Sequence, residues 1–211
     1  MKNYLKTAFV ALLLAGTFTG CSEDDDITLP ETAYATYSED FGKFDAGTGA
    51  YTFDLAASGW TVFTEAGTKN WFQNNFGTGA SNNVYFEFSS FNSGNASNIG
   101  WLITPAINLD ATKLKRMIFQ AAQHHATSLD NKLEVLVSDN FDGTNVLAAD
   151  WTVKSFRVPP YIGYGGTNYE FVNSGVVDLS AYSGEVYVAF RVKGNSTTQT
   201  GGFQVDNIKV F

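Results

Sequence analysis

Residues 185–193 read "EVYVAFRVK", a stretch in which bulky apolar side chains occupy every second position. Successive side chains of an extended chain point to opposite faces, so this spacing gives a strand one apolar face and one mixed face. The apolar face consists of Val186, Val188, Phe190 and Val192. The same alternation recurs in "VYFEF" at 84–88 and in "KLEVLVSD" at 132–139. Half-buried β-strands are therefore the basic unit of this fold.

Other short segments repeat that pattern, and turn-forming Gly, Asn, Ser and Asp residues separate them. Further predicted strands are 36–41, 60–65, 100–103, 116–122, 151–158, 169–173 and 202–211. They bring the total to about ten strands, and no helical periodicity appears. The 20 glycines and the 15% of aromatic residues suit tight turns and a ring-rich core. The sequence thus predicts one all-β domain over residues 34–211, built of two facing antiparallel sheets.

The first 20 residues predict a signal peptide. Lys2 and Lys6 precede an apolar run at residues 8–15 that is too short to cross a bilayer as a helix. The "FTGC" that follows resembles the lipobox of bacterial lipoproteins, in which cleavage precedes the cysteine, and it implies that Cys21 is lipidated. The alternative is an ordinary secretory signal followed by a chance cysteine.

Residues 21–33 predict a lipidated cysteine followed by an acidic tether. The segment "SEDDDITLPE" after Cys21 is polar and poor in core-forming residues, as a solvated linker should be. It resembles the surface-export tag of lipoproteins from gut-type anaerobic Gram-negative bacteria, and the alternative is a simple spacer. We therefore predict an outer-membrane lipoprotein that is exposed on the cell surface.

The charge balance disfavours several classes of partner. Without residues 1–20 the chain carries 11 basic and 21 acidic side chains, a formal charge of −10, of which residues 34–211 contribute −5. An acidic domain without a dense Lys/Arg stripe argues against binding to nucleic acid or to anionic membrane surfaces. Cys21 is the only cysteine, so neither a disulfide framework nor thiolate catalysis is expected.

Several blocks spread over residues 34–211 resemble one family. They are "SGW" (58–60), "NW" (70–71), "GWLITPAINL" (100–109), "LEVLVSDNFDG" (133–143), Trp151, "VDLSAYSGEVYVAFRVKG" (177–194) and "GFQVDNIKV" (202–210). Together they resemble the choice-of-anchor J domain, a group similar to the cleaved-adhesin modules of gingipain haemagglutinins and, more distantly, to MAM domains. The resemblance implies a jelly-roll β-sandwich on a secreted or surface-anchored protein that is used in adhesion or glycan contact. It implies no enzymatic activity.

The last predicted strand, "GGFQVDNIKVF" at 201–211, carries a carboxylate inside an otherwise apolar segment. Its apolar positions have one parity before Asp206 and the other parity after Asn207. One extra residue at a β-bulge would restore a single buried face, so we predict a bulge at this point. A buried carboxylate is costly unless it is hydrogen-bonded or bound to a cation.

The resemblance also implies one structural Ca²⁺, because MAM-like and adhesin relatives often carry such an ion. The first and last strands of a jelly roll tend to be neighbours, which would bring Glu39 and Asp40 to Asp206. Calcium takes six to eight oxygen ligands, and we predict these three carboxylates among them. Where relatives have Phe-Glu this chain has Phe41-Gly42, so the first-strand ligand would be Glu39 or Asp40. The alternative is that Asp206 accepts backbone hydrogen bonds at the bulge.

A glycan site requires flat aromatic side chains together with amides or carboxylates that bind hydroxyl groups. Residues of this kind on loop-like segments are Trp71, Asn74, Tyr161, Tyr164 and Tyr169. We predict that they contact the ligand. The alternative is that the aromatic side chains pack in the core or at an interface.

Catalytic motifs are missing from the sequence. Neither G-x-S-x-G nor H-E-x-x-H occurs. His124 and His125 are adjacent, and neighbours on a strand point to opposite faces, so one ion is not expected to use both. A pair at a strand end or in a loop is the preferred interpretation. Glu87 and Glu134 lie opposite the apolar faces of their strands and are expected to face solvent, and the alternative is that they point into a groove. An enzyme is therefore disfavoured.

The sequence favours a surface-exposed lipoprotein whose jelly-roll domain binds a ligand noncovalently, and a host or dietary glycan is the preferred ligand. The alternative is an adhesin or structural subunit that contacts a host or cell-surface protein at the outer membrane. A glycan-active hydrolase is the least favoured function, because it would require two carboxylates in one cleft.

Overall fold

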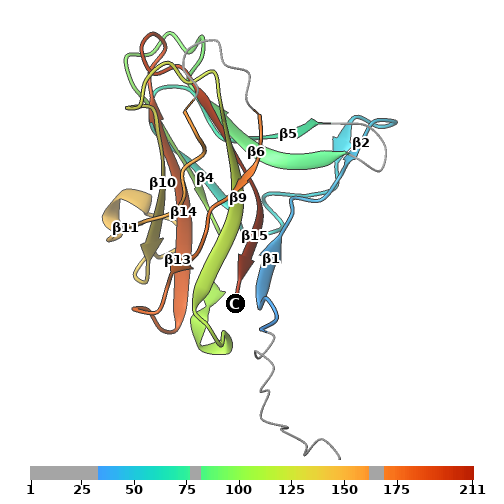
Figure 1. The fold of residues 1–211 in the computed structure, drawn as a ribbon, viewed down its shortest axis with the longest axis vertical. Helices are drawn as coiled ribbons and strands as arrows, with labels where there is room; N and C mark the ends of the chain where they lie inside the picture. Colours follow the sequence, from blue (N-terminus) through green and yellow to red (C-terminus); the bar gives the residue numbers. More distant parts are fainter. Residues whose placement is uncertain (1–32, 77–81, 162–168) are drawn as a thin grey trace, which may run out of the picture. The chain divides into compact units, whose positions relative to one another are not determined.

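Two antiparallel β-sheets face each other in the computed structural model (Figure 1). The structure describes residues 33–76, 82–161 and 169–211, which all belong to one unit, residues 33–211. These residues form fifteen strands and two short 3-10 helices, η2 (Leu109–Ala111) and η3 (Val146–Ala148). In this part of the chain no helix has the length and apolar character needed to span a bilayer.

The larger sheet has seven strands. Its main order is β12 (Val172–Asn173), β9 (Arg116–His124), β15 (Gly202–Val210), β6 (Asn83–Ser89) and β5 (Phe72–Phe76). In addition, β1 (Tyr37–Glu39) pairs with β15, and β13 (Val177–Asp178) pairs with β9. Every pairing is antiparallel.

The second sheet has six strands. Its main order is β11 (Thr152–Lys154), β10 (Lys132–Ser138), β14 (Glu185–Gly194), β7 (Asn98–Ile103) and β4 (Thr61–Ala66), and β8 (Ile107–Asn108) pairs with the start of β14. A separate hairpin joins β2 (Phe44–Asp45) to β3 (Ala50–Tyr51). The predicted all-β jelly-roll sandwich of two antiparallel sheets is confirmed.

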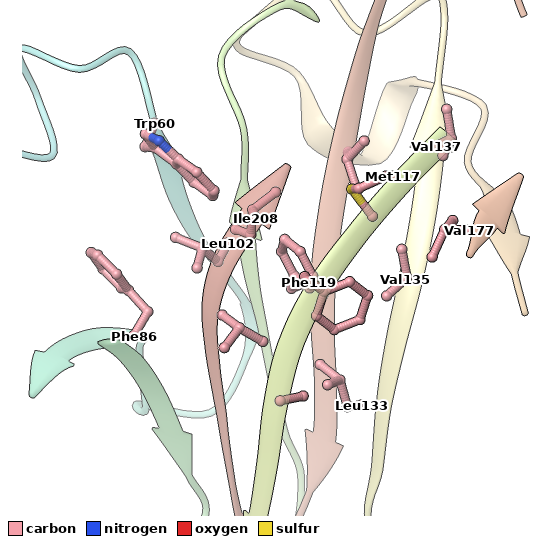
Figure 2. Packing of buried hydrophobic residues seen from close by; sticks show 14 of the residues in the cluster. Trp60, Phe86, Leu102, Met117, Phe119, Leu133, Val135, Val137, Val177 and Ile208 are labelled. Carbon is pink, nitrogen blue, oxygen red and sulfur yellow. The ribbon is translucent and has the colours of Figure 1, made fainter. Parts of the chain in front are cut away.

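The apolar faces of the two sheets form the main core. The four apolar side chains of the 185–193 stretch are all fully buried, namely Val186, Val188, Phe190 and Val192. Phe119 of β9 and Phe190 of β14 meet edge to face across the two sheets, with ring centroids 5.0 Å apart. Figure 2 shows Phe119, Leu133 and Val135 pointing into the space between the strands. The sequence alternation thus identifies the buried face of each long strand.

A smaller apolar cluster covers the outer face of the six-stranded sheet. The indole of Trp101 lies 5.4 Å from that of Trp151 and donates a hydrogen bond to the Glu65 carboxylate at 2.8 Å. The guanidinium of Arg191 stacks on Trp101 at 4.6 Å and is 2.7 Å from Glu134. Glu134 is therefore held in an ion pair on this face.

The predicted bulge in β15 is present. The register with β9 shifts between Asp206 and Lys209, and Asn207 has a φ of 50°, a left-handed conformation that asparagine tolerates. The shift puts Val205 and Ile208 on the same buried side of the sheet, and both are fully buried. The bulge thus keeps the apolar face of β15 continuous, at the expense of a local shift in its pairing with β9.

Candidate ligand-binding site

The candidate site lies on the outer face of the seven-stranded sheet, opposite the core. Phe86 and Phe203 point into the core, so their neighbours Glu87 and Gln204 point outward. Pairing of β15 with β6 sets Gln204 directly opposite Glu87. Pairing of β15 with β9 sets Gly202 opposite His124. Strand register thus gathers polar side chains from three strands at one place.

Glu87 is the centre of a buried polar network. Its residue is only 8% exposed, and its Oε2 accepts hydrogen bonds from the Asn74 amide at 3.1 Å and the Gln204 amide at 2.9 Å. Its Oε1 lies 3.2 Å from Nε2 of His124. Burial alone would raise the pKa of Glu87, but the contacts with His124, Gln204 and Asn74 outweigh it and hold that pKa below its usual value. Glu87 is therefore an ionised, buried carboxylate, and the prediction that it faces solvent was wrong.

The two histidines face each other at the end of β9. Their Nδ1 atoms are 3.1 Å apart, and His125 has a φ of 49°. The preferred interpretation of a pair at a strand end is confirmed, because β9 ends at His124. The left-handed residue after it turns the second ring back, so the rule that neighbours point to opposite faces does not apply to this pair. His124 is buried and His125 is exposed. Gly202 makes room for the first ring, because a Cβ there would collide with Nε2 of His124.

Tyr169 closes the site from the segment before β12. Its ring stacks on the His124 imidazole, with centroids 4.7 Å apart and planes inclined by 21°. Its hydroxyl lies 3.3 Å from Nδ1 of His125. The residue is 48% exposed, so one edge of the ring remains accessible to a ligand.

These groups line a cavity of about 450 Å³. The lining residues are Glu87, Ser89, Phe91, His124, His125, Tyr169 and Thr200. Phe91 is 60% exposed and supplies a second accessible aromatic ring. A cavity with two rings, a buried carboxylate and several hydroxyl and imidazole groups can stack on an apolar face and bind hydroxyls at the same time.

The residues predicted to contact a ligand lie in different places in the structure. Asn74 and Tyr169 both belong to the candidate site, Asn74 through its hydrogen bond to Glu87. Tyr161 lines a different cavity of about 350 Å³, together with Gln123 and Phe203. Tyr164 lies outside the described residues.

Trp71 is not part of the candidate site. Its residue is 3% exposed, its indole nitrogen donates to the carbonyl oxygen of Gly100 at 3.1 Å, and its ring packs on Phe88. The prediction that Trp71 contacts a ligand was wrong, because the side chain belongs to the core between the sheets.

Sequence reasoning missed Glu87, His124, His125 and Gln204 as a group. One signal in the sequence was the glutamate of "VYFEF", a charged residue with aromatic side chains on both sides. Glu134 gives no second acid for catalysis here, because it lies on the outer face of the other sheet with Arg191. Glu87 and Glu134 therefore do not share a cleft.

The predicted calcium ligands lie at the other end of β15. β1 does pair with β15, with Glu39 opposite Ile208. Asp206 is 1% exposed, and its carboxylate accepts hydrogen bonds from the backbone and side-chain nitrogens of Asn207 at 2.6 and 3.0 Å. Burial, together with the charges of Asp40 and Glu39, raises the pKa of Asp206 to about 6.

As arranged, these carboxylates do not fit a metal cage. Within the described ranges no group of three His, Cys, Asp or Glu side chains is placed to hold a metal ion. Glu39 accepts from the backbone nitrogen of Phe41 at 2.8 Å, and Asp40 accepts from that of Gly42 at 3.0 Å. The carboxylates of Glu39 and Asp40 thus already accept hydrogen bonds from the backbone that follows them. The calcium ion stays a prediction.

Comparisons with known proteins are confined to structure, since neither a family model nor a curated protein matches the sequence. The K2 cleaved adhesin domain of Lys-gingipain superposes with a TM-score of 0.53 at 17% identity, covering 83% of this chain and 98% of that chain. The K1 cleaved adhesin domain of Lys-gingipain from Porphyromonas gingivalis W83 gives 0.47 at 16% identity, covering 83% and 96%. A carbohydrate-binding module of the β-sandwich superfamily gives 0.46 at 12%, covering 82% and 62%. The chain therefore has the β-sandwich fold seen in the K2 domain.

Proposed function

We propose that the outer face of the seven-stranded sheet binds a carbohydrate noncovalently. The observation that carries this proposal is the buried carboxylate of Glu87 at the base of a cavity that also holds the accessible rings of Tyr169 and Phe91. Sugars bind to proteins through just this combination, because their C–H faces stack on rings and their hydroxyls need polar partners. No second carboxylate of the described residues lines this cavity, which favours binding over hydrolysis.

The test is a glycan array probed with residues 33–211, the unit that contains all described strands. We expect a defined set of oligosaccharides to bind, and Tyr169→Ala to abolish their binding. Tyr34→Ala is the matched control, because Tyr34 is 85% exposed and does not line the cavity. An array without any bound glycan would sink the proposal.

The second candidate function is adhesion to a protein. It is favoured by the likeness to a solved domain that is named a cleaved adhesin domain, and by the resemblance of the sequence to the choice-of-anchor J group. The array experiment distinguishes the two if surface proteins are printed beside the glycans. Binding to proteins alone, insensitive to Tyr169→Ala, would support adhesion through another surface.

We also propose that the protein is a lipoprotein of the outer membrane, exposed on the cell surface. The support is the "FTGC" segment with Cys21 and the acidic stretch that follows it. Metabolic labelling of a Gram-negative host with a palmitate analogue should mark the protein, and Cys21→Ser should remove the label. Label that persists in Cys21→Ser would contradict lipidation at this residue.

A further inference from the structure

We propose that His124, His125 and Tyr169 form a binding site for one divalent transition-metal ion of the Zn²⁺ type at the cavity. Three donor atoms meet there: the two Nδ1 atoms are 3.1 Å apart, and the Tyr169 hydroxyl is 3.3 Å from Nδ1 of His125. Neighbouring ligands of an ion bound at about 2.0 to 2.1 Å are separated by about 3 Å, which is the spacing seen here. The zinc site shares Tyr169 and the cavity with the proposed sugar site, but the spacing of its donor atoms is an observation that does not depend on sugar binding.

The carboxylate of Glu87 determines which nitrogen of His124 is free to bind a metal. The Oε1 of Glu87 lies 3.2 Å from Nε2 of His124, and a carboxylate oxygen can only accept from that nitrogen, so this placement favours the tautomer with the proton on Nε2. The lone pair of the ring is then on Nδ1, the atom that faces His125. A carboxylate that orients an imidazole in this way is the usual second layer of a histidine metal site.

Without a metal, the same tautomer makes His125 the donor between the rings. In that tautomer the Nδ1–H of His125 donates to Nδ1 of His124 across the 3.1 Å between them, and its proton lies between the two nitrogens. A bound metal ion would take that position. The proton would move through solvent from Nδ1 to the exposed Nε2 of His125.

The choice of metal follows from the donor atoms. Imidazole nitrogen binds Zn²⁺, Cu²⁺ and Ni²⁺ well, whereas Ca²⁺ and Mg²⁺ prefer oxygen ligands. Tyr169 is the weakest of the three ligands, because it offers a phenol oxygen where these ions prefer imidazole nitrogen. Three protein ligands leave at least one coordination position free for water or for a ligand in the cavity.

The experiment is calorimetric titration of untagged residues 33–211 with zinc chloride at pH 7.5. We expect one Zn²⁺ per chain, and any binding of calcium or magnesium should be the same with and without the His125 imidazole. His125→Asn removes the imidazole and still tolerates the positive φ, so it should fold normally and lose the zinc site. Glu87→Gln should weaken zinc binding by about 10- to 100-fold, because it releases the orientation of His124. Tyr169→Phe should have the smallest effect.

Nitrogen-15 spectra of the imidazoles give a second readout, independent of affinity. His124 should carry its proton on Nε2 both with and without zinc, while His125 should change from the Nδ1–H to the Nε2–H form when zinc is added. Stoichiometric zinc binding that survives His125→Asn, or the absence of any zinc binding, would overturn the proposal. Glycan binding measured with and without a chelator separates the two proposals, since either one can fail alone.

Discussion

At the scale of single residues, the sandwich tolerates two buried carboxylates in different ways. Glu87 is compensated by two amides and an imidazole, which keep it charged. Asp206 is held by the nitrogens of Asn207 and by the Asn83 side chain, and two further acids lie near it. Its raised pKa shows that the compensation at this end of β15 is incomplete.

The raised pKa of Asp206 predicts a pH-dependent stability. The folded-state pKa of about 6 exceeds the ordinary value of 3.8, so the folded protein binds the proton more tightly than the unfolded chain. The contribution of this group to stability is therefore complete below about pH 4 and is lost as the pH rises through about 6. Ionised Asp206 costs on the order of 3 kcal/mol at neutral pH.

Asp206→Asn should remove that loss. In denaturant unfolding curves recorded from pH 4 to pH 7.5, the free energy of unfolding of the variant should gain on the parent protein as the pH rises. The comparison between the two proteins cancels the opposite contribution of groups such as Glu87, whose pKa is lowered. Curves that stay parallel over this range would show that Asp206 titrates normally.

The same variant tests the predicted calcium ion. A ligand that binds only the folded state raises the melting temperature, so a bound calcium ion would make the parent protein melt at a higher temperature in millimolar calcium than in EDTA at pH 7.5. Asp206→Asn should lose this difference if its carboxylate is a ligand. Equal melting temperatures of the parent protein in calcium and in EDTA would exclude a structural calcium ion.

At the scale of elements, β15 connects the core, the bulge and the candidate site. Both the alternation of its residues and the bulge could be predicted from the sequence, because a shift of the apolar residues from odd to even positions is visible within one strand. The pairing of Gln204 with Glu87 was not legible, since register depends on strands that are far apart in the chain. The turn at His125 was hidden as well, because a positive φ at a histidine leaves no pattern.

Strand length decided which elements could be predicted. β9, β10, β14 and β15 have seven to ten residues and alternate clearly. Two-residue strands such as β8 and β13 are too short for any alternation, so the sequence suggested fewer strands than the structure contains. Trp71 was misassigned for a related reason: a single ring beside a turn looks the same in the core and on the surface.

Gly202 offers a test of the link between β15 and the site. Its backbone is compatible with alanine, but the added Cβ would displace the ring of His124. We expect Gly202→Ala to weaken zinc binding at least tenfold and to lower stability by about 1 to 3 kcal/mol through overpacking. Gly47→Ala is the control, because Gly47 lies in the β2–β3 turn, also without a positive φ. Unchanged zinc affinity in Gly202→Ala would show that the ring position is unimportant.

At the scale of the whole molecule, one core joins the two sheets and carries the stability. Phe190 of β14 is fully buried and meets Phe119 of the opposite sheet. Phe190→Ala should lower the free energy of unfolding by about 3 to 5 kcal/mol, as large-to-small changes in well-packed cores do. Leu147→Ala, at a residue that is 64% exposed, should change it by less than about 0.5 kcal/mol. Urea unfolding of both variants measures the difference. Equal effects would contradict the conclusion that the packing of Phe190 stabilises the fold.

The pairing of β1 with β15 has a mechanical consequence. β15 runs from Gly202, beside the cavity, to Val210, which pairs with Tyr37 where the chain enters the sandwich. A nine-residue strand is roughly 30 Å long, so an occupant of the cavity and the segment before Tyr37 pull on opposite ends of the same strand. Tension between them would slide β1 lengthwise along β15. The hydrogen bonds of that pairing would then be strained together, in shear, rather than opened one after another like a zipper.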